Sequence, residues 1–241
     1  MGDFAIEWDQ DGERFYQTGV DHGVVYPVSV EESTRGQYTN GYAWNGLSNV
    51  TESPEGAESN PIYADNMKYL NLLSAEELKL SIEAYYYPPQ FEVCDGTASV
   101  MKGVKLGQQT RRKFGFAYRT KLGNDIEGDD YGYEIHLIYG CTASPSEKSH
   151  DTTNDSPEAT TFSWDIDTIP VSGIKINGVD YKPSASMTIS SRDVTSAQLA
   201  AIEKVLYGTP ASTSEGGETI PAVPGRLPLP AEVYSIMAAA Q

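Results

Sequence analysis

Alternation of apolar and polar residues with a period of two is the feature that most constrains this fold. From Leu78 to Tyr86 every second side chain is apolar, which places one face of a β-strand against a core. Pro88 and Pro89 follow and remove two successive backbone donors, so we expect the strand to end there. Ser74 and Glu77 resemble a helical capping box, but the apolar spacing of two favours the strand.

The same alternation recurs further along the chain. It covers residues 114–118, 133–139 and 162–166, and the polar stretch 121–132 between the first two predicts a long hairpin with a mobile acidic tip. Asn177-Gly178 lies between two short apolar runs, which is the strongest local signal for a further hairpin. These patterns predict a mainly β protein.

One helix stands out among the predicted strands. Thr195 is placed as its N-cap, Gln198 completes a capping box, and Gly208 with Pro210 ends it. The apolar side chains on one stripe of this helix are Leu199, Ile202, Val205 and Leu206.

The regions outside these elements read as loops. Residues 33–72 are expected to be loop-like, with Trp44, Tyr63 and Tyr69 as anchors for contacts between subunits. Residues 209–241 are rich in Pro, Gly and Ser and are expected to form an extended C-terminal arm, ending in a short helix that needs a partner surface. We therefore expect a β domain over residues 1–208 and an arm over 209–241.

Charge limits the partners of this chain. It has 34 acidic residues against 17 Lys and Arg, a formal net charge of −17, which opposes steady binding to nucleic acid or anionic membranes. No apolar run is long enough to cross a bilayer. The basic cluster Arg111, Arg112 and Lys113 is expected to pair with carboxylates of a neighbouring subunit. Cys94 and Cys141 lack paired spacing and are expected to be free thiols.

No pattern in the sequence predicts catalysis. The three histidines, His22, His136 and His150, lie far apart without metal-ligand spacing, and we expect no metal and no cofactor. Acidic turns near Asp9 and Asn124 lack the spacing of a calcium loop. Nucleophile elbows and phosphate-binding glycine loops are also missing from the sequence, so we expect that the protein is not an enzyme.

The order of several segments resembles a known family. These segments are "FYQTGVDHGVVYP", "AWNGLSNVTESPEGAESNPIYADNMKYL", "SIEAYYYPPQFEVCDG", "GQQTRRKFGFAYRTKLGND", "YGYEIHLIYGCTASPSEKSHDTTNDSPEATTFSW" and "LAAIEKVLYG", and they span most of residues 15–208. In this order they resemble the major tail proteins, or tail tube subunits, of long-tailed phages with non-contractile tails.

The resemblance implies a β-sandwich or barrel-like tail-tube domain with one flanking α-helix and long loops. It further implies a virion protein, made in the host bacterial cytoplasm, that forms stacked hexameric rings through which double-stranded DNA passes. Tape-measure, tail terminator and distal tail or baseplate proteins would be its partners, with no membrane. The alternatives are a tube protein of a contractile injection system, which shares the fold, and a carbohydrate-binding β-sandwich with sugar-stacking tyrosines.

Two loops are expected to contact neighbouring subunits, because both are long and weakly apolar. The first runs from Ser33 to Met67, and the second is the acidic tip from Asn124 to Tyr131. The carboxylates of the second loop are expected to face the lumen of the tube or a neighbouring subunit, and an acidic lumen would keep DNA from adhering. These carboxylates are Asp125, Glu127, Asp129 and Asp130.

Overall fold

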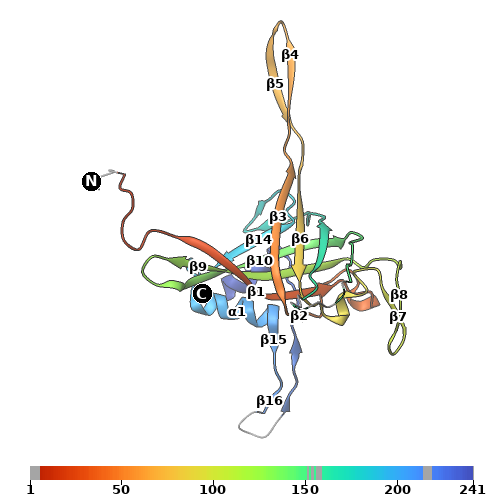
Figure 1. Ribbon diagram of the computed structural model, residues 1–241. Helices are drawn as coiled ribbons and strands as arrows, with labels where there is room; N and C mark the ends of the chain where they lie inside the picture. The colour runs from red at the N-terminus through yellow and green to blue at the C-terminus, as the bar shows by residue number, and fades with distance from the viewer. Residues whose placement is uncertain (1–5, 151, 153–154, 156–158, 214–218, 241) are drawn as a thin grey trace.

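The computed structural model describes residues 6–150, 152, 155, 159–213 and 219–240. The chain is mainly β, as the alternating pattern predicts, and it has a β-sandwich-like body, as the resemblance implies, together with two helices. Figure 1 shows hairpins and the N-terminal segment projecting from this body in different directions. No described helix is long and apolar enough to span a membrane.

Two sheets share one long strand. Sheet A contains β1 (Tyr16–Pro27), β2 (Tyr42–Trp44), β9 (Phe114–Asn124), β10 (Gly128–Ala143) and β14 (Ser186–Ser190). Sheet B contains the end of β10 with β11 (Phe162–Asp167), β6 (Glu76–Ala84) and β3 (Leu47–Gly56). The pairing is antiparallel throughout, in the order β2-β1-β9-β10-β11-β6-β3, with β14 on β10.

Gly140 allows β10 to pass from one sheet to the other. Its φ is +64°, and a Cβ there would lie 2.2 Å from the carbonyl oxygen of Ile169, so the position accepts no larger residue without a shift. The register against β9 changes between Ile138 and Cys141, and the next residues pair with β11. A bend of this kind is how a strand turns the corner of a sandwich.

Sheet A is buried on both faces. Between the two sheets lies an aromatic core in which Trp44 packs against Phe91, Phe116 and Trp164, with ring centroids 4.5–5.7 Å apart. On the other face, side chains such as Ile135 and Leu137 pack beneath the helices. This explains why β9 and β10 are apolar at many successive positions.

The two helices are α1 (Ser196–Tyr207) and α2 (Pro230–Ala239). The predicted capping box of α1 is confirmed, because the amide of Gln198 donates to Thr195 Oγ1 over 3.3 Å and the Thr195 amide donates to Gln198 Oε1 over 3.0 Å. Gly208 follows with φ +76°. Ile202 and Leu206 are buried against sheet A.

Short hairpins and turns complete the structure. They are β4 (Ser59–Ala64) with β5 (Met67–Leu73), β7 (Ala98–Met101) with β8 (Val104–Leu106), β12 (Lys175–Ile176) with β13 (Val179–Asp180), β15 (Gly208–Thr209) with β18 (Val223–Pro224), β16 (Ser212–Thr213) with β17 (Thr219–Ile220), and the 3₁₀ turns Glu32–Thr34 and Pro89–Phe91. The predicted hairpin at Asn177-Gly178 is confirmed, with positive φ at both residues.

Two predicted loops have more structure than the sequence suggested. Residues 42–73 form four strands, because β3 pairs with β6 along its whole length even though Pro54 and the flanking glycines interrupt its apolar pattern. Pro54 is compatible with β3 because this is an edge strand, in which every second amide points away from the neighbouring β6 and makes no ladder hydrogen bond. The expected extended arm leaves the body as a hairpin and returns, so that Leu227 and Val233 are buried beside α1.

Candidate assembly surfaces

The longest projection is a continuous ribbon in which β3 and β6 lead into β4 and β5 (Figure 1). At Gly56 the φ is +85° and a Cβ would lie 2.2 Å from the carbonyl oxygen of Ala75, so the chain turns at a position where glycine fits best. The tip turn, Asp65-Asn66, has positive φ at both residues, as a two-residue hairpin loop requires.

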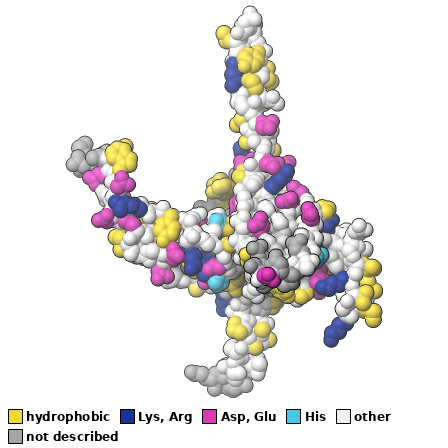
Figure 2. Space-filling view, in the orientation of Figure 1, with side chains coloured by type: hydrophobic (Ala, Val, Ile, Leu, Met, Phe, Trp, Pro, Cys, Tyr) yellow, Lys and Arg dark blue, Asp and Glu magenta, His cyan; other side chains and the backbone are white. Residues whose placement is uncertain are grey.

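The β4–β5 hairpin, residues 59–73, exposes large apolar side chains on a thin support. Tyr63 is 68% exposed and Tyr69 is 70% exposed, and apolar side chains gather at this tip in Figure 2. The other exposed apolar residues of the hairpin are Ile62, Met67, Leu70, Leu72 and Leu73. An isolated two-stranded hairpin is marginally stable in water, and a large exposed apolar patch marks an interaction surface. The β4–β5 hairpin therefore needs a partner.

The three predicted anchors differ in location and burial. Tyr63 and Tyr69 lie on the β4–β5 hairpin, but Trp44 is 2% exposed and belongs to the core between the sheets. Its indole nitrogen donates to the carbonyl oxygen of Tyr86 over 2.9 Å. Trp44 is thus a structural residue of the body, and its burial depends on neighbours that are distant in the sequence.

A second hairpin projects on another side. Figure 1 shows β7–β8 on the right of the body, and Figure 2 shows apolar and basic side chains along it. Val100 and Met101 are 60% and 64% exposed, and Lys102 lies in the turn beside Gly103, whose φ is +83°. The base is closed by the Gln109 amide, which donates to the carbonyl oxygen of Gly96 over 2.9 Å.

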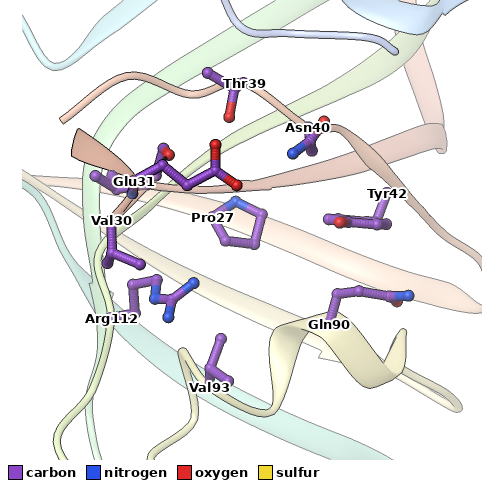
Figure 3. Close-up of a pocket in the computed structure, with 11 residues that line it drawn as sticks. Pro27, Val30, Glu31, Thr39, Asn40, Tyr42, Gln90, Val93 and Arg112 are labelled. Atoms are coloured by element: carbon purple, nitrogen blue, oxygen red, sulfur yellow. Dashed lines mark hydrogen bonds between the residues drawn. The ribbon is translucent and has the colours of Figure 1, made fainter. Parts of the chain in front are cut away.

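The predicted basic cluster lies at the base of the β7–β8 hairpin. Lys113 is exposed, and Arg111 and Arg112 are half-buried. Figure 3 shows the Arg112 side chain in a groove of about 260 Å³ lined by Val30 and Val93, among others. The pairing of this basic cluster with carboxylates of a neighbouring subunit stays a prediction.

The third hairpin, β15–β18 with β16–β17, points away from the β4–β5 hairpin at the opposite side of the body (Figure 1). Ile220 and Val223 on it are 50% and 57% exposed. Its tip, residues 214–218, lies outside the described residues. Two apolar projections that point in opposite directions suit assembly in a head-to-tail manner.

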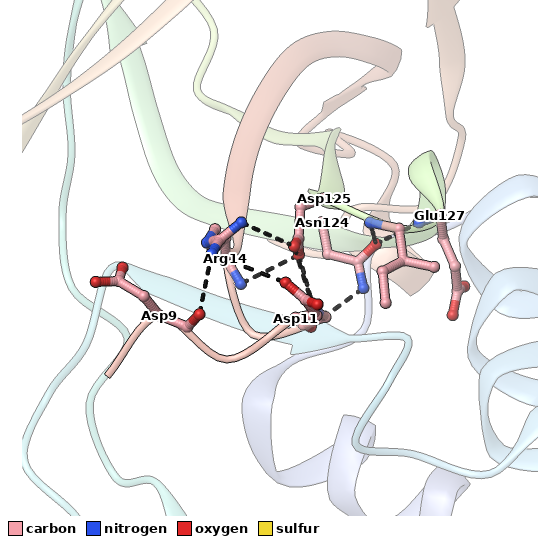
Figure 4. A network of polar contacts seen from close by, with 8 residues as sticks. Asp9, Asp11, Arg14, Asn124, Asp125 and Glu127 are labelled. Carbon is pink, nitrogen blue, oxygen red and sulfur yellow. Dashed lines mark hydrogen bonds and ion pairs between the residues drawn. The ribbon is translucent and has the colours of Figure 1, made fainter. Parts of the chain in front are cut away.

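The acidic tip between β9 and β10 contacts the N-terminal segment of its own chain (Figure 4). Asp125 accepts hydrogen bonds from the amides of Gly12 at 3.0 Å and Arg14 at 3.4 Å, and it forms an ion pair with the Arg14 guanidinium at 3.5 Å. Desolvation raises the pKa of Asp125, but these donors outweigh it and the pKa lies below its ordinary value.

Further contacts within the chain reach this tip, and its mobility stays a prediction. The Tyr16 hydroxyl donates to Asp129 over 2.9 Å, and Asn124 Oδ1 accepts from the amides of Ile126 and Glu127. Glu127 and Asp130 are exposed. Whether these carboxylates face a lumen or a neighbouring subunit stays a prediction.

A polar cluster around His136 lies beside a cavity of about 450 Å³ between β3 and sheet A. The His136 ring stacks on Tyr118 at 4.6 Å, and the Tyr118 hydroxyl donates to Glu52 over 2.6 Å. Desolvation lowers the pKa of His136, although the charges of Glu52 and Glu134 oppose this. No cluster of metal-binding side chains occurs within the described residues. His136 thus lies where β3 approaches sheet A, with Nδ1 3.9 Å from Glu52.

The tyrosines and the one thiol of residues 78–96 mostly pack within the body. Tyr87 packs edge-on against Phe162 and Trp164, while Tyr85 and Tyr86 are about half-exposed. Cys94 and Cys141 are free and buried, which confirms the prediction of unpaired thiols. Burial raises the pKa of the Cys94 thiol to about 12, so it is not a reactive thiolate at neutral pH.

Comparison with known proteins adds little to this picture. No protein-family model matches the chain, and no curated protein matches it. Among solved structures, it is similar to a chain of the anti-feeding prophage baseplate, solved by cryo-electron microscopy with six-fold symmetry, at a TM-score of 0.36 and 9% identity over 76% of this chain and 97% of that chain. A likeness this distant assigns neither family nor function.

Proposed function

We propose that this protein is a structural subunit of a phage tail tube and that it acts through contacts with copies of itself rather than through catalysis. In this proposal, six copies form a ring and stacked rings form the conduit through which DNA leaves the capsid. The tape-measure protein would lie inside the tube, and terminator and distal tail proteins would bind its ends. The site of action is the virion, after synthesis in the host bacterial cytoplasm.

The observation that carries this proposal is the apolar β4–β5 hairpin. The hairpin exposes Tyr63, Tyr69 and Leu73 by 68–70%, on a ribbon that leaves the body, where no other described part of the chain covers them. A second support is the net charge of −17, which would let DNA slide without adhering to a wall made of such subunits. The resemblance of segments across residues 15–208 to tail tube subunits is a third.

The test removes the hairpin without disturbing the body. Because Gly56 pairs with Glu76, residues 57–75 can be replaced by Asn-Gly, which closes β3 and β6 with a two-residue turn. We expect a folded monomer that forms no tubes by negative-stain electron microscopy, whereas the unaltered chain forms tubes. A matched control, Lys182→Ala, changes an exposed residue on a different loop and should assemble. Normal tubes from the shortened chain would refute the proposal.

A further inference from the structure

Basic residues are segregated along this acidic chain. From Gly96 to Asn124 there are seven Lys and Arg and no Asp or Glu, whereas the whole chain has a net charge of −17. Five of these seven lie on the β7–β8 hairpin or at its base: Lys102, Lys105, Arg111, Arg112 and Lys113. The β7–β8 hairpin is therefore a basic projection on an acidic molecule.

The β7–β8 hairpin also lacks apolar cover. Val104 and Leu106 on β8 are 46% and 54% exposed, in addition to Val100 and Met101 on β7. Strands of three and four residues bury too little area to be stable alone, so the hairpin is suited to packing against another surface. Lys105 already pairs with Glu92 of the same chain, but Lys102 in the turn is exposed and forms no ion pair within the described residues.

A surface of opposite charge lies on the outer face of sheet B. Paired residues of an antiparallel sheet lie on the same face, and the register places Asp167 beside Lys79, and Glu77 opposite Glu55. We call this surface the acidic face; its carboxylates are Glu55, Glu77, Glu83, Asp165 and Asp167. It is the side of the strands opposite to the buried Leu80 and Ile82.

Within the described residues, one ion pair reaches the acidic face. Lys79 lies 2.7 Å from Glu55, and its pKa is raised by that hydrogen bond and by the charges of Glu55, Asp167 and Glu77. One lysine thus interacts electrostatically with three carboxylates. Like charges directly opposite one another on neighbouring strands, as Glu55 and Glu77 are, destabilise the pair. A cation supplied from outside would relieve this repulsion.

We propose that the β7–β8 hairpin of one copy docks on the acidic face of a second copy. Lys102 would then lie among the carboxylates around Glu77 and Asp167. The contact is heterologous, because a projection on one copy meets a different patch on the next, and such contacts generate rings or filaments. This inference rests on the proposed function, since it names the two surfaces through which the copies associate.

A second copy suits the β7–β8 hairpin better than nucleic acid does. Phosphate binding relies on several cations that contact the backbone at once, and Lys105 of this hairpin is already paired. The exposed Val100, Met101, Val104 and Leu106 have no counterpart on a phosphate backbone. The molecule outside residues 96–124 carries all 34 acidic residues, which attracts a basic hairpin and repels DNA.

The test is a charge swap. Lys102→Glu should raise the concentration needed for assembly by about tenfold or more, because it sets like charges in contact. The double variant Lys102→Glu with Glu77→Lys should restore assembly, since every copy then carries both reversed surfaces. Lys182→Glu changes the charge by the same amount on another loop and should assemble as the unaltered chain does. Sedimentation velocity across a concentration series gives the assembly midpoint, and equal melting temperatures show that each variant folds.

The outcomes separate this inference from the proposed function. If the unaltered chain and Lys102→Glu assemble equally, the docking inference is wrong and the tube proposal stands. If Lys102→Glu fails but the double variant is not rescued, the acidic face is the wrong partner surface. If Lys102→Glu assembles normally but retains less DNA than the unaltered chain, the hairpin binds nucleic acid and the inference is overturned. If the unaltered chain never assembles, the tube proposal itself fails.

Discussion

Trp44 and Tyr69 allow a direct test of which aromatic residues hold the body and which serve assembly. The Trp44 side chain is 2% exposed and contacts three aromatic rings in the core, whereas Tyr69 is 70% exposed on the β4–β5 hairpin. Truncation of a buried tryptophan to alanine costs about 3–5 kcal/mol, from lost burial and from the cavity that remains. Substitution of an exposed residue usually changes stability by about 0.5 kcal/mol or less.

The two variants should therefore fail in different assays. For a domain of this size each kcal/mol shifts the melting temperature by about 2–4 °C, so Trp44→Ala should melt roughly 10 °C below the unaltered chain. Tyr69→Ala should melt within about 2 °C of it by the same scaling but lose assembly in electron microscopy. Differential scanning calorimetry of unassembled protein, in parallel with negative-stain imaging, measures both.

A conservative variant makes this test sharper. Trp44→Phe keeps an aromatic ring in the core but removes the indole donor, so the carbonyl oxygen of Tyr86 loses its partner at a cost of about 1–3 kcal/mol. We expect its melting temperature to lie between those of Trp44→Ala and the unaltered chain. If Trp44→Ala left stability unchanged, or if Tyr69→Ala lowered it as much, the division between core and assembly residues would be wrong.

Three further predictions concern the body. Asp21→Asn should lower the free energy of unfolding by about 0.5–1 kcal/mol at pH 7, because the Arg119 hydrogen bond holds the pKa of this partly exposed carboxylate below its ordinary value. This stabilisation is lost as pH falls below about 4. Urea titrations of the two proteins should therefore give the same stability at that pH. Thr195→Ala should cost about 1 kcal/mol through loss of the α1 cap, measured by thermal circular dichroism, and no loss would count against the capping box. Native protein should resist iodoacetamide at Cys94 and Cys141 until it is unfolded, as read by mass spectrometry; rapid native labelling would contradict their burial.

The sequence predicts those helices and hairpins that are determined by residues close together in the chain. The α1 helix could be predicted because Thr195 and Gln198 form a cap within a single turn, and the Asn177-Gly178 hairpin because both residues accept positive φ. The β3 strand could not be predicted from its own residues, because it is stabilised by pairing with β6 and because Pro54 interrupts its alternation of apolar and polar residues. Pairing between segments more than twenty residues apart leaves little local signal.

The aromatic residues that the sequence suggests as anchors differ in burial for a similar reason. Tyr63 and Tyr69 were recognised as aromatic residues in a weakly apolar segment, and they are exposed. Trp44 has the same local context, but its three ring partners come from distant parts of the chain. The partners of Asp125 come from the N-terminal segment more than a hundred residues earlier, which no pattern around the tip could reveal.

The net charge and the apolar hairpins act against each other, and this opposition has a physical consequence for when assembly occurs. Exposed residues such as Tyr69 and Leu73 favour association, whereas a charge of −17 on each copy repels an approaching copy once the surfaces come within about one Debye length, near 8 Å at physiological salt. A basic hairpin directed at an acidic face lowers this barrier along one approach only. In the proposed assembly, repulsion elsewhere would disfavour other arrangements, so the same charge that keeps free copies apart would also select the orientation in which copies join.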